Sequence, residues 1–143
     1  MQHSVYGFKD LSVVMSHPAM GQIEINGEGA KSITFAKAND VSQHDVAADG
    51  SVMTSKIEAR NGTVTIVVQQ TSAANKWFTR LYNYLQTADL SEWTQISMLG
   101  TSNSMKVTHE GTGISIQKRP DAPYQSQGGE MSWTFLASEL KEY

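Results

Sequence analysis

Cysteine is absent from the 143-residue sequence. Its absence excludes disulfide bonds and thiolate metal sites, and it agrees with a reducing compartment. Long apolar runs are also absent, since none approaches the roughly 20 residues that a membrane helix needs. Residues 1–10 lack a basic patch followed by an apolar stretch, which argues against a secretory signal. We therefore expect no membrane contact, and folding in the cytoplasm of the producing cell.

A large excess of positive or negative charge is absent as well. The chain carries 11 Lys and Arg against 14 Asp and Glu, for a net charge of −3. Proteins that grip nucleic acid do so through Lys and Arg that neutralise phosphates, so the sequence argues against tight nucleic-acid binding. The densest basic pairs are Lys118 with Arg119 and Lys76 with Arg80. We expect these side chains to be solvated surface charges.

Histidine and serine form no recognisable motif of enzyme chemistry. The four histidines, His3, His17, His44 and His109, show no His-x-x-x-His or His-Glu-x-x-His spacing. A histidine without such a partner is expected on the surface or in a loop. The Gly-x-Ser-x-Gly elbow of one large class of hydrolases is missing. No catalytic residue is assigned.

Acidic residues and glycines give no clearer site. Asp40, Asp45 and Asp49 share one polar stretch, but their spacing does not match a calcium-binding loop. The glycine-flanked run at 27–29 lacks the third glycine of a dinucleotide fingerprint and is expected to be a hairpin turn. The sequence therefore assigns neither a metal site nor a cofactor.

Hydrophobic periodicity predicts a mainly β fold. Residues 31–37, 62–70 and 131–135 alternate apolar and polar side chains with a period of two, as half-buried strands do. Turn residues separate shorter candidate strands at 22–26, 52–58, 94–99, 105–109 and 113–118. No linker, low-complexity block or internal repeat divides the chain, so residues 1–143 are expected to form one domain. We predict an antiparallel β-sandwich or partial barrel.

One segment, residues 73–88, has the spacing of an amphipathic helix, with Ser72 placed as its N-cap. The apolar stripe of this helix is expected to pack in the core of the domain, and a cofactor site is the less favoured interpretation. The stripe consists of Trp77, Phe78, Leu81, Tyr82 and Leu85. The predicted fold therefore has one helix flanking the sheet.

The candidate strand at 52–58 is polar on both faces, with Thr54, Lys56 and Glu58 on one face and Ser55 on the other. Such a strand buries little within one subunit. A sheet wetted by a channel, or continued across neighbouring subunits, would explain it, because an open edge presents N–H and C=O groups that a partner strand can satisfy. This pattern favours association over catalysis.

Several runs in order along the chain resemble one family. They are His-Asp-Val-Ala-Ala-Asp-Gly-Ser-Val-Met-Thr-Ser-Lys-Ile at 44–57, Asn-Gly-Thr-Val-Thr-Ile at 61–66, Gln-Gln-Thr-Ser at 69–72, Trp77 with Tyr-Asn-Tyr-Leu at 82–85, Gln-Lys-Arg-Pro-Asp-Ala-Pro-Tyr at 117–124 and Trp-Thr-Phe at 133–135. Together they resemble the tail-tube proteins of contractile-tailed bacteriophages, whose fold is related to type VI secretion tubes. The resemblance spans nearly the whole chain.

The resemblance implies a virion structural protein and not an enzyme. Its subunits would form stacked hexameric rings whose inner strands join into one barrel, and DNA would pass through the bore during ejection. The implied partners are other copies of the chain and the sheath, baseplate and terminator proteins. The implied location is the virion tail, after assembly in the cytoplasm of the bacterial host.

Two regions acquire roles from this resemblance. The polar segment 38–51 would be a loop that extends to a neighbouring subunit or ring, with Asp40, His44, Asp45 and Asp49 in contact. The bore would be lined by the strands around 31–39 and 52–58, and the candidate residues are Lys31, Lys37, Thr54, Lys56 and Glu58. We expect the three lysines to pair with carboxylates or to turn away from the bore, since a conduit must not bind phosphates.

Other classes of protein remain open. The same fold could serve as a tail terminator or as a secretion-system tube. A small β-sandwich hydrolase would use His44 or His109 in a concave site. A carbohydrate-binding module would present Trp93 or Tyr124 as an exposed stacking platform.

Overall fold

The computed structural model describes residues 7–26 and 29–143, so His3 and the greater part of the 27–29 run lie outside the described residues. Ten principal elements follow one another along the chain. They are β1 (Leu11–His17), β2 (Gly21–Ile25), β3 (Ala30–Lys37), β4 (Ser42–Val46), β5 (Val52–Lys56), β6 (Gly62–Gln69), α1 (Ala73–Thr87), β7 (Ile96–Ser102), β8 (Val107–Lys118) and β9 (Glu130–Glu142). Short 3-10 turns occur at Phe8–Asp10 and Leu90–Glu92.

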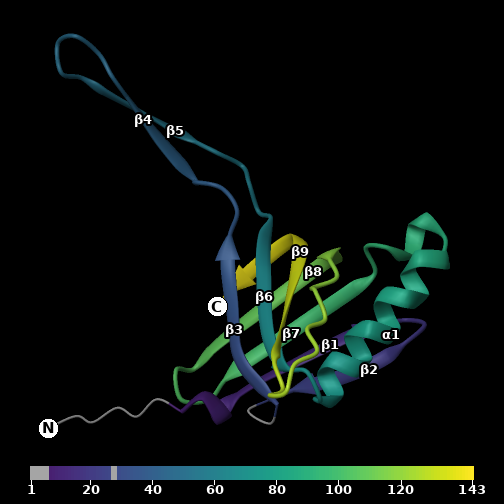
Figure 1. Ribbon diagram of the computed structural model, residues 1–143. Coiled ribbons are helices and arrows are strands. Elements are labelled where there is room, and N and C mark those ends of the chain that lie inside the picture. The colour runs from purple at the N-terminus through teal and green to yellow at the C-terminus, as the bar shows by residue number, and fades with distance from the viewer. Residues whose placement is uncertain (1–6, 27–28) are drawn as a thin grey trace, which may run out of the picture.

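Seven strands form one antiparallel sheet in the order β2-β1-β7-β8-β9-β6-β3. The sheet curls into a half-barrel, and α1 lies across its open side (Figure 1). The expected fold class is confirmed, because the fold is mainly β and antiparallel with one flanking helix, in the partial-barrel form. No helix in the described ranges is long and apolar enough to span a membrane.

The core lies inside the curl because the strands alternate in burial. In β6, Val64, Ile66 and Val68 are fully buried, and the residues between them are half-buried. In β9, Trp133 and Phe135 are also fully buried, and they pack around Phe78 of α1 at ring-centroid distances of 5.5 and 5.2 Å. Period-two patterning therefore puts one face of each strand into a shared apolar interior.

The helix forms where its apolar spacing predicts. Ser72 caps it, since the Ser72 hydroxyl accepts a hydrogen bond from the backbone N–H of Asn75 at 3.2 Å. Trp77, Phe78, Leu81 and Leu85 are buried, and Tyr82 is half-buried against the same core. The helical core stripe therefore matches the sequence prediction, with Tyr82 at its margin.

Inside the half-barrel, an aromatic contact joins two strands that are not neighbours in the sheet, β3 and β8. The Phe35 ring of β3 stacks on the His109 ring of β8, with centroids 4.1 Å apart and an interplanar angle of 3°. Beneath them, Gly100 of β7 leaves room for the Phe35 ring, because a Cβ at Gly100 would lie 3.3 Å from Phe35 Cζ. The two halves of the sheet thus meet through side chains.

Two strand predictions are wrong. The single strand β8 takes in residues 107–109 and 113–118 and continues through Gly113, whereas Met105 and Lys106 lie in the turn before it. Gly113 has φ +60°, and a Cβ there would lie 2.8 Å from the Cβ of Ser138. A glycine therefore permits a local irregularity without ending the strand. Strand β1 was not predicted, because Val13 and Val14 are adjacent and break the alternation.

His17 contradicts the expectation that every histidine is a surface or loop residue. This side chain is 2% exposed, and both ring nitrogens are used. Nδ1 accepts from the Ala19 N–H at 3.1 Å, and Nε2 lies 3.1 Å from the Glu92 carbonyl oxygen. Two backbone partners satisfy the ring, so it is buried without a metal or a carboxylate.

Candidate assembly surfaces

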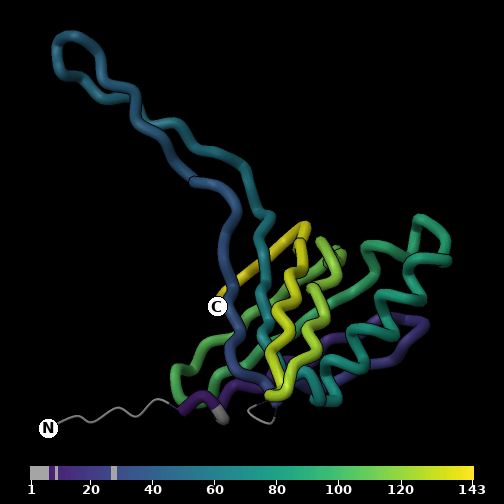
Figure 2. The backbone as a smooth tube through the Cα atoms, in the orientation of Figure 1, coloured from purple at the N-terminus to yellow at the C-terminus, as the bar shows by residue number. Residues whose placement is uncertain are grey.

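A long β-hairpin projects from the body of the domain, as Figure 2 shows. We call residues 38–61 the arm. Strands β4 and β5 pair from Ser42↔Lys56 to Val46↔Val52, and a tight turn closes the arm where the Gly50 N–H donates to the Ala47 carbonyl at 2.9 Å. The segment 38–51, expected to be a loop, is therefore one limb of a hairpin and its turn.

The arm has no core of its own. Every residue of β4 and β5 is exposed, and the large apolar side chains of Val41, Val46, Val52 and Met53 are 54–64% exposed. An isolated two-stranded hairpin is marginally stable in water, and clustered exposed apolar side chains mark interaction surfaces. The arm thus has the properties of a segment that another chain covers.

The acidic residues singled out in the sequence all lie on this arm. Asp40, Asp45 and Asp49 are exposed together with His44, and none of the ion pairs in the described residues involves them. Asp49 Oδ1 accepts from the Ser51 hydroxyl at 2.7 Å and from the Ser51 N–H at 3.0 Å. These hydrogen bonds lower the pKa of the Asp49 carboxyl, which favours a negative charge at the tip.

The outer face of β3, β6 and β9 is covered by hydroxyl side chains. We define the hydroxyl face as Ser32, Thr34, Thr63, Thr65, Ser132 and Thr134. Thr34, Thr65 and Thr134 lie directly opposite one another across the three strands. On these strands, ionisable residues occur only towards the ends, so the middle of the face carries hydroxyl, methyl and aliphatic groups without charge.

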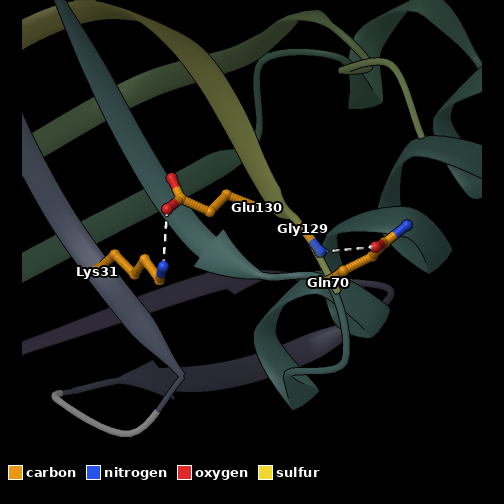
Figure 3. Close-up of polar contacts among 4 residues, drawn as sticks. All are labelled: Lys31, Gln70, Gly129 and Glu130. Carbon is orange, nitrogen blue, oxygen red and sulfur yellow. Dashed lines mark hydrogen bonds and ion pairs between the residues drawn. The ribbon is translucent and has the colours of Figure 1, made fainter. Parts of the chain in front are cut away.

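The candidate bore lysines divide between the sheet and the arm. Lys31, at one end of β3, forms an ion pair with Glu130 at 2.7 Å, and beside it the Gln70 Oε1 accepts from the Gly129 N–H at 3.3 Å (Figure 3). Lys37, at the other end of β3, donates to the Leu140 carbonyl. A small polar pocket of about 210 Å³ opens beside Lys31.

The other bore candidates, Thr54, Lys56 and Glu58, belong to the arm. Lys56 pairs with Glu58 at 3.2 Å in an exposed ion pair. Lys31 and Lys56 therefore meet the expected carboxylate, whereas Lys37 meets a backbone carbonyl instead.

The sheet has two free edges on the side that carries the hydroxyl face. Strand β3 pairs only with β6, so its outer edge meets no described strand. At the other side, β7 begins at Ile96 opposite Ile114, and Ser115, Ile116 and Lys118 of β8 pair with β9 alone. Between these edges lie four strands in the order β3-β6-β9-β8.

The residues considered for a hydrolase or a carbohydrate-binding site lie at separate places in residues 7–26 and 29–143. No group of three or more His, Asp or Glu there could hold a metal ion. His44 is exposed on the arm, and His109 is stacked on Phe35. Trp93 is half-buried against the core, while Tyr124 is 93% exposed. The histidines and aromatics of the alternative functions therefore do not converge on one site.

The fold is shared with components of contractile injection systems. An anti-feeding prophage cap, a tube-terminating cap, has a TM-score of 0.64 at 10% identity over 100% of this chain and 93% of that chain. A PVC sheath/tube terminator in the extended state has a TM-score of 0.67 at 8% identity over 99% and 98%. A PVC sheath-tube complex in the extended state gives 0.65 at 8% identity over 99% and 93%.

Sequence comparison adds the family. No curated protein matches the chain significantly. The family described as bacteriophage PhiTE tail tube protein matches residues 3–143. The chain belongs to this family of phage tail tube proteins, as its resemblance predicts. The family consists of structural tube proteins, and the chain is a tail-tube component of a phage-like particle.

Proposed function

We propose that the chain assembles into hexameric rings, which stack into the tube through which phage DNA is ejected. The observation that carries this proposal is that one subunit has both two free sheet edges and an exposed arm without a core. Each is unfavourable in an isolated subunit, because open edges and exposed apolar side chains invite association. Closing a ring of subunits removes both liabilities.

The strand count supports a continuous barrel. Four strands, β3, β6, β9 and the end of β8, alternate in direction, so the two outer strands run antiparallel to each other. When β3 of one subunit meets the end of β8 in the next, the junction is also antiparallel. A ring of any number of subunits therefore continues one regular hydrogen-bonding pattern.

The wall of the proposed bore is the hydroxyl face. Across β3, β6 and β9 the middle of this wall offers no Lys or Arg, so DNA phosphates there would find no cation to displace their counterions. On the fourth strand, Lys118 at the end of β8 lies opposite Thr134. Hydroxyl groups instead keep water bound to the wall, which lets a hydrated polyanion slide. Lys31 lies at one rim and is neutralised by Glu130, and Lys37 at the other rim is engaged by a carbonyl.

The arm and the exterior would hold the remaining partners. Similar folds occur in a sheath-tube complex, a sheath/tube terminator and a baseplate. We infer contacts with sheath, baseplate and terminator proteins in the virion tail, after assembly in the host cytoplasm. Asp40, His44, Asp45 and Asp49 would contact other subunits through the arm, together with Thr54, Lys56 and Glu58.

A single-cysteine experiment tests the bore, because the chain has no native cysteine. Ser132→Cys places one thiol on the hydroxyl face with little change in volume. In dissociated subunits, a small maleimide and a maleimide on a bulky polymer should both react. In assembled tubes, only the small reagent should react along the tube length. Equal reaction of the bulky reagent in tubes would refute the assignment of this face to the bore.

A tube-terminating ring is the second candidate, because terminator caps share the fold. A terminator stops at one ring, whereas a tube subunit keeps adding rings. Sedimentation at increasing protein concentration separates them, since a terminator reaches a limiting size and a tube protein does not.

A further inference from the structure

The outward face of α1 carries two cations that no described side chain neutralises. Lys76 and Arg80 are exposed and four residues apart, so they lie on the same side of the helix. They are the only charged residues in α1, and none of the ion pairs in the described residues involves them. Like charges at this spacing weaken an isolated helix, so an acidic ligand between them would relieve a repulsion.

A groove accompanies these cations. It has a volume of about 630 Å³ and is lined by Ala73, Asn75, Lys76, Thr79 and Arg80. The polar groups of its floor are already satisfied, because the Thr79 hydroxyl donates to the Asn75 carbonyl at 2.9 Å and the Asn75 side chain is bonded on both of its polar atoms. The two cationic heads therefore remain as the groups available to a ligand, and they select an acidic one.

The arm carries acidic side chains of the kind that these two cations would bind. Asp40, Asp45 and Asp49 are exposed, and none of the ion pairs in the described residues involves them, while Val46, Val52 and Met53 offer apolar surface beside them. The arm leaves the body on the side of β3, whereas α1 lies on the opposite side (Figure 1). A subunit therefore does not bring its own arm to its own helix, but a neighbour placed on the β3 side could present α1 to the arm.

Resting on the ring assembly proposed above, we propose that the groove on α1, with Lys76 and Arg80, is the docking site for the acidic arm of a second copy of this chain. The contact joins two different surfaces, so it can repeat from subunit to subunit, either around a closed ring or from one ring to the next. Lys76 and Arg80 attract the arm carboxylates, and the aliphatic parts of both side chains cover its valines and Met53.

A charge-swap experiment tests this contact. Lys76→Glu with Arg80→Glu should raise the critical concentration for polymerisation at least about tenfold, because like charges would then face each other. Asp45→Lys with Asp49→Lys should do the same. Combining all four changes should restore polymerisation to within about threefold of the parent protein. The charge-preserving pair Lys76→Arg with Arg80→Lys is the matched control, and circular dichroism reports whether each variant is folded.

The outcomes separate this contact from the proposed function. If the parent protein never polymerises, the proposed function fails. If the parent protein polymerises and Lys76→Glu with Arg80→Glu leaves the critical concentration unchanged, the arm does not bind in the groove. That result overturns this contact alone. Loss of sheath binding with unchanged polymerisation would instead assign the groove to the sheath. The contact would also be overturned if both double variants are folded and polymerise poorly, and the variant that combines all four changes polymerises no better.

Discussion

The indole N–H of Trp133 donates a hydrogen bond to Asn75 Oδ1 at 2.9 Å, joining the first part of β9 to the first turn of α1. Trp133 is fully buried, so this N–H has no access to water. The Asn75 amide nitrogen donates in turn to the Gln70 carbonyl at 3.0 Å. One polar side chain therefore orients the helix on an apolar sheet and fixes the turn that leads into it.

Replacing Asn75 with Ala should lower the free energy of unfolding by about 1–3 kcal/mol, because the buried indole N–H loses its acceptor. Trp133→Phe removes the N–H donor instead, and the loss for the double variant should be smaller than the sum of the two single losses if the indole bond couples them. Urea denaturation monitored by circular dichroism measures all three values. Strictly additive losses would show that the indole bond is not the cause.

Gly62 begins β6 at the base of the arm, where no side chain fits. A Cβ there would lie 2.6 Å from Leu140 Cδ2 and 2.7 Å from the Ala36 carbonyl oxygen. Gly62→Ala should therefore cost about 1–3 kcal/mol of unfolding free energy through overpacking. Gly128→Ala is the control, because nothing lies within 4 Å of a Cβ at that position. Thermal unfolding should separate the two, and equal midpoints would contradict the steric account.

Removing the arm should separate folding from assembly. Residues 38–61 can be replaced by Asn-Gly, since Lys37 and Gly62 are already paired across β3 and β6 and this dipeptide suits a tight hairpin. The shortened protein should keep its β-sheet circular dichroism but stay unpolymerised in sedimentation velocity, because the core is intact and the arm contact is gone. Polymerisation at the parent concentration would contradict the role of the arm.

The Asp49 carboxyl should titrate below its ordinary value of 3.8, because the Ser51 hydroxyl and N–H stabilise its charged form. A lowered pKa in the folded state stabilises the turn above the unfolded pKa, and this contribution is lost as the pH falls through the lowered value. Ser51→Ala should move the pKa of Asp49 upward. NMR titration of the side-chain carboxyl measures the shift, and an unchanged pKa would rule out the hydroxyl as its main cause.

Strand and helix positions were largely predictable because burial is periodic. Residues 31–37, 62–70 and 73–88 matched their observed elements to within one residue at each end, since each buries one clear face. The missed strand β1 buries one face beside a half-buried Val14, which hides its period. The sequence predicts two strands where the structure has the single strand β8, because Gly111 and Gly113 resemble a turn. In the structure, Gly113 accommodates an irregularity within the strand.

The assembly surfaces were less predictable. Sequence periodicity indicated that the segment 52–58 buries little, but it gave no sign that 42–46 pairs with it to form an arm. The hydroxyl face depends on register, because Thr34, Thr65 and Thr134 become neighbours only when three distant strands pair. Similarly, Lys76 and Arg80 were expected to be solvated charges, and the groove beside them exists only in the folded helix.

Negative-stain electron microscopy of the purified protein at increasing concentration tests the central claim most directly. The claim predicts hollow tubes that lengthen with concentration, built of stacked rings with a stain-filled bore. A folded protein that remains monomeric at the highest concentration, or that stops at a single ring, would contradict it.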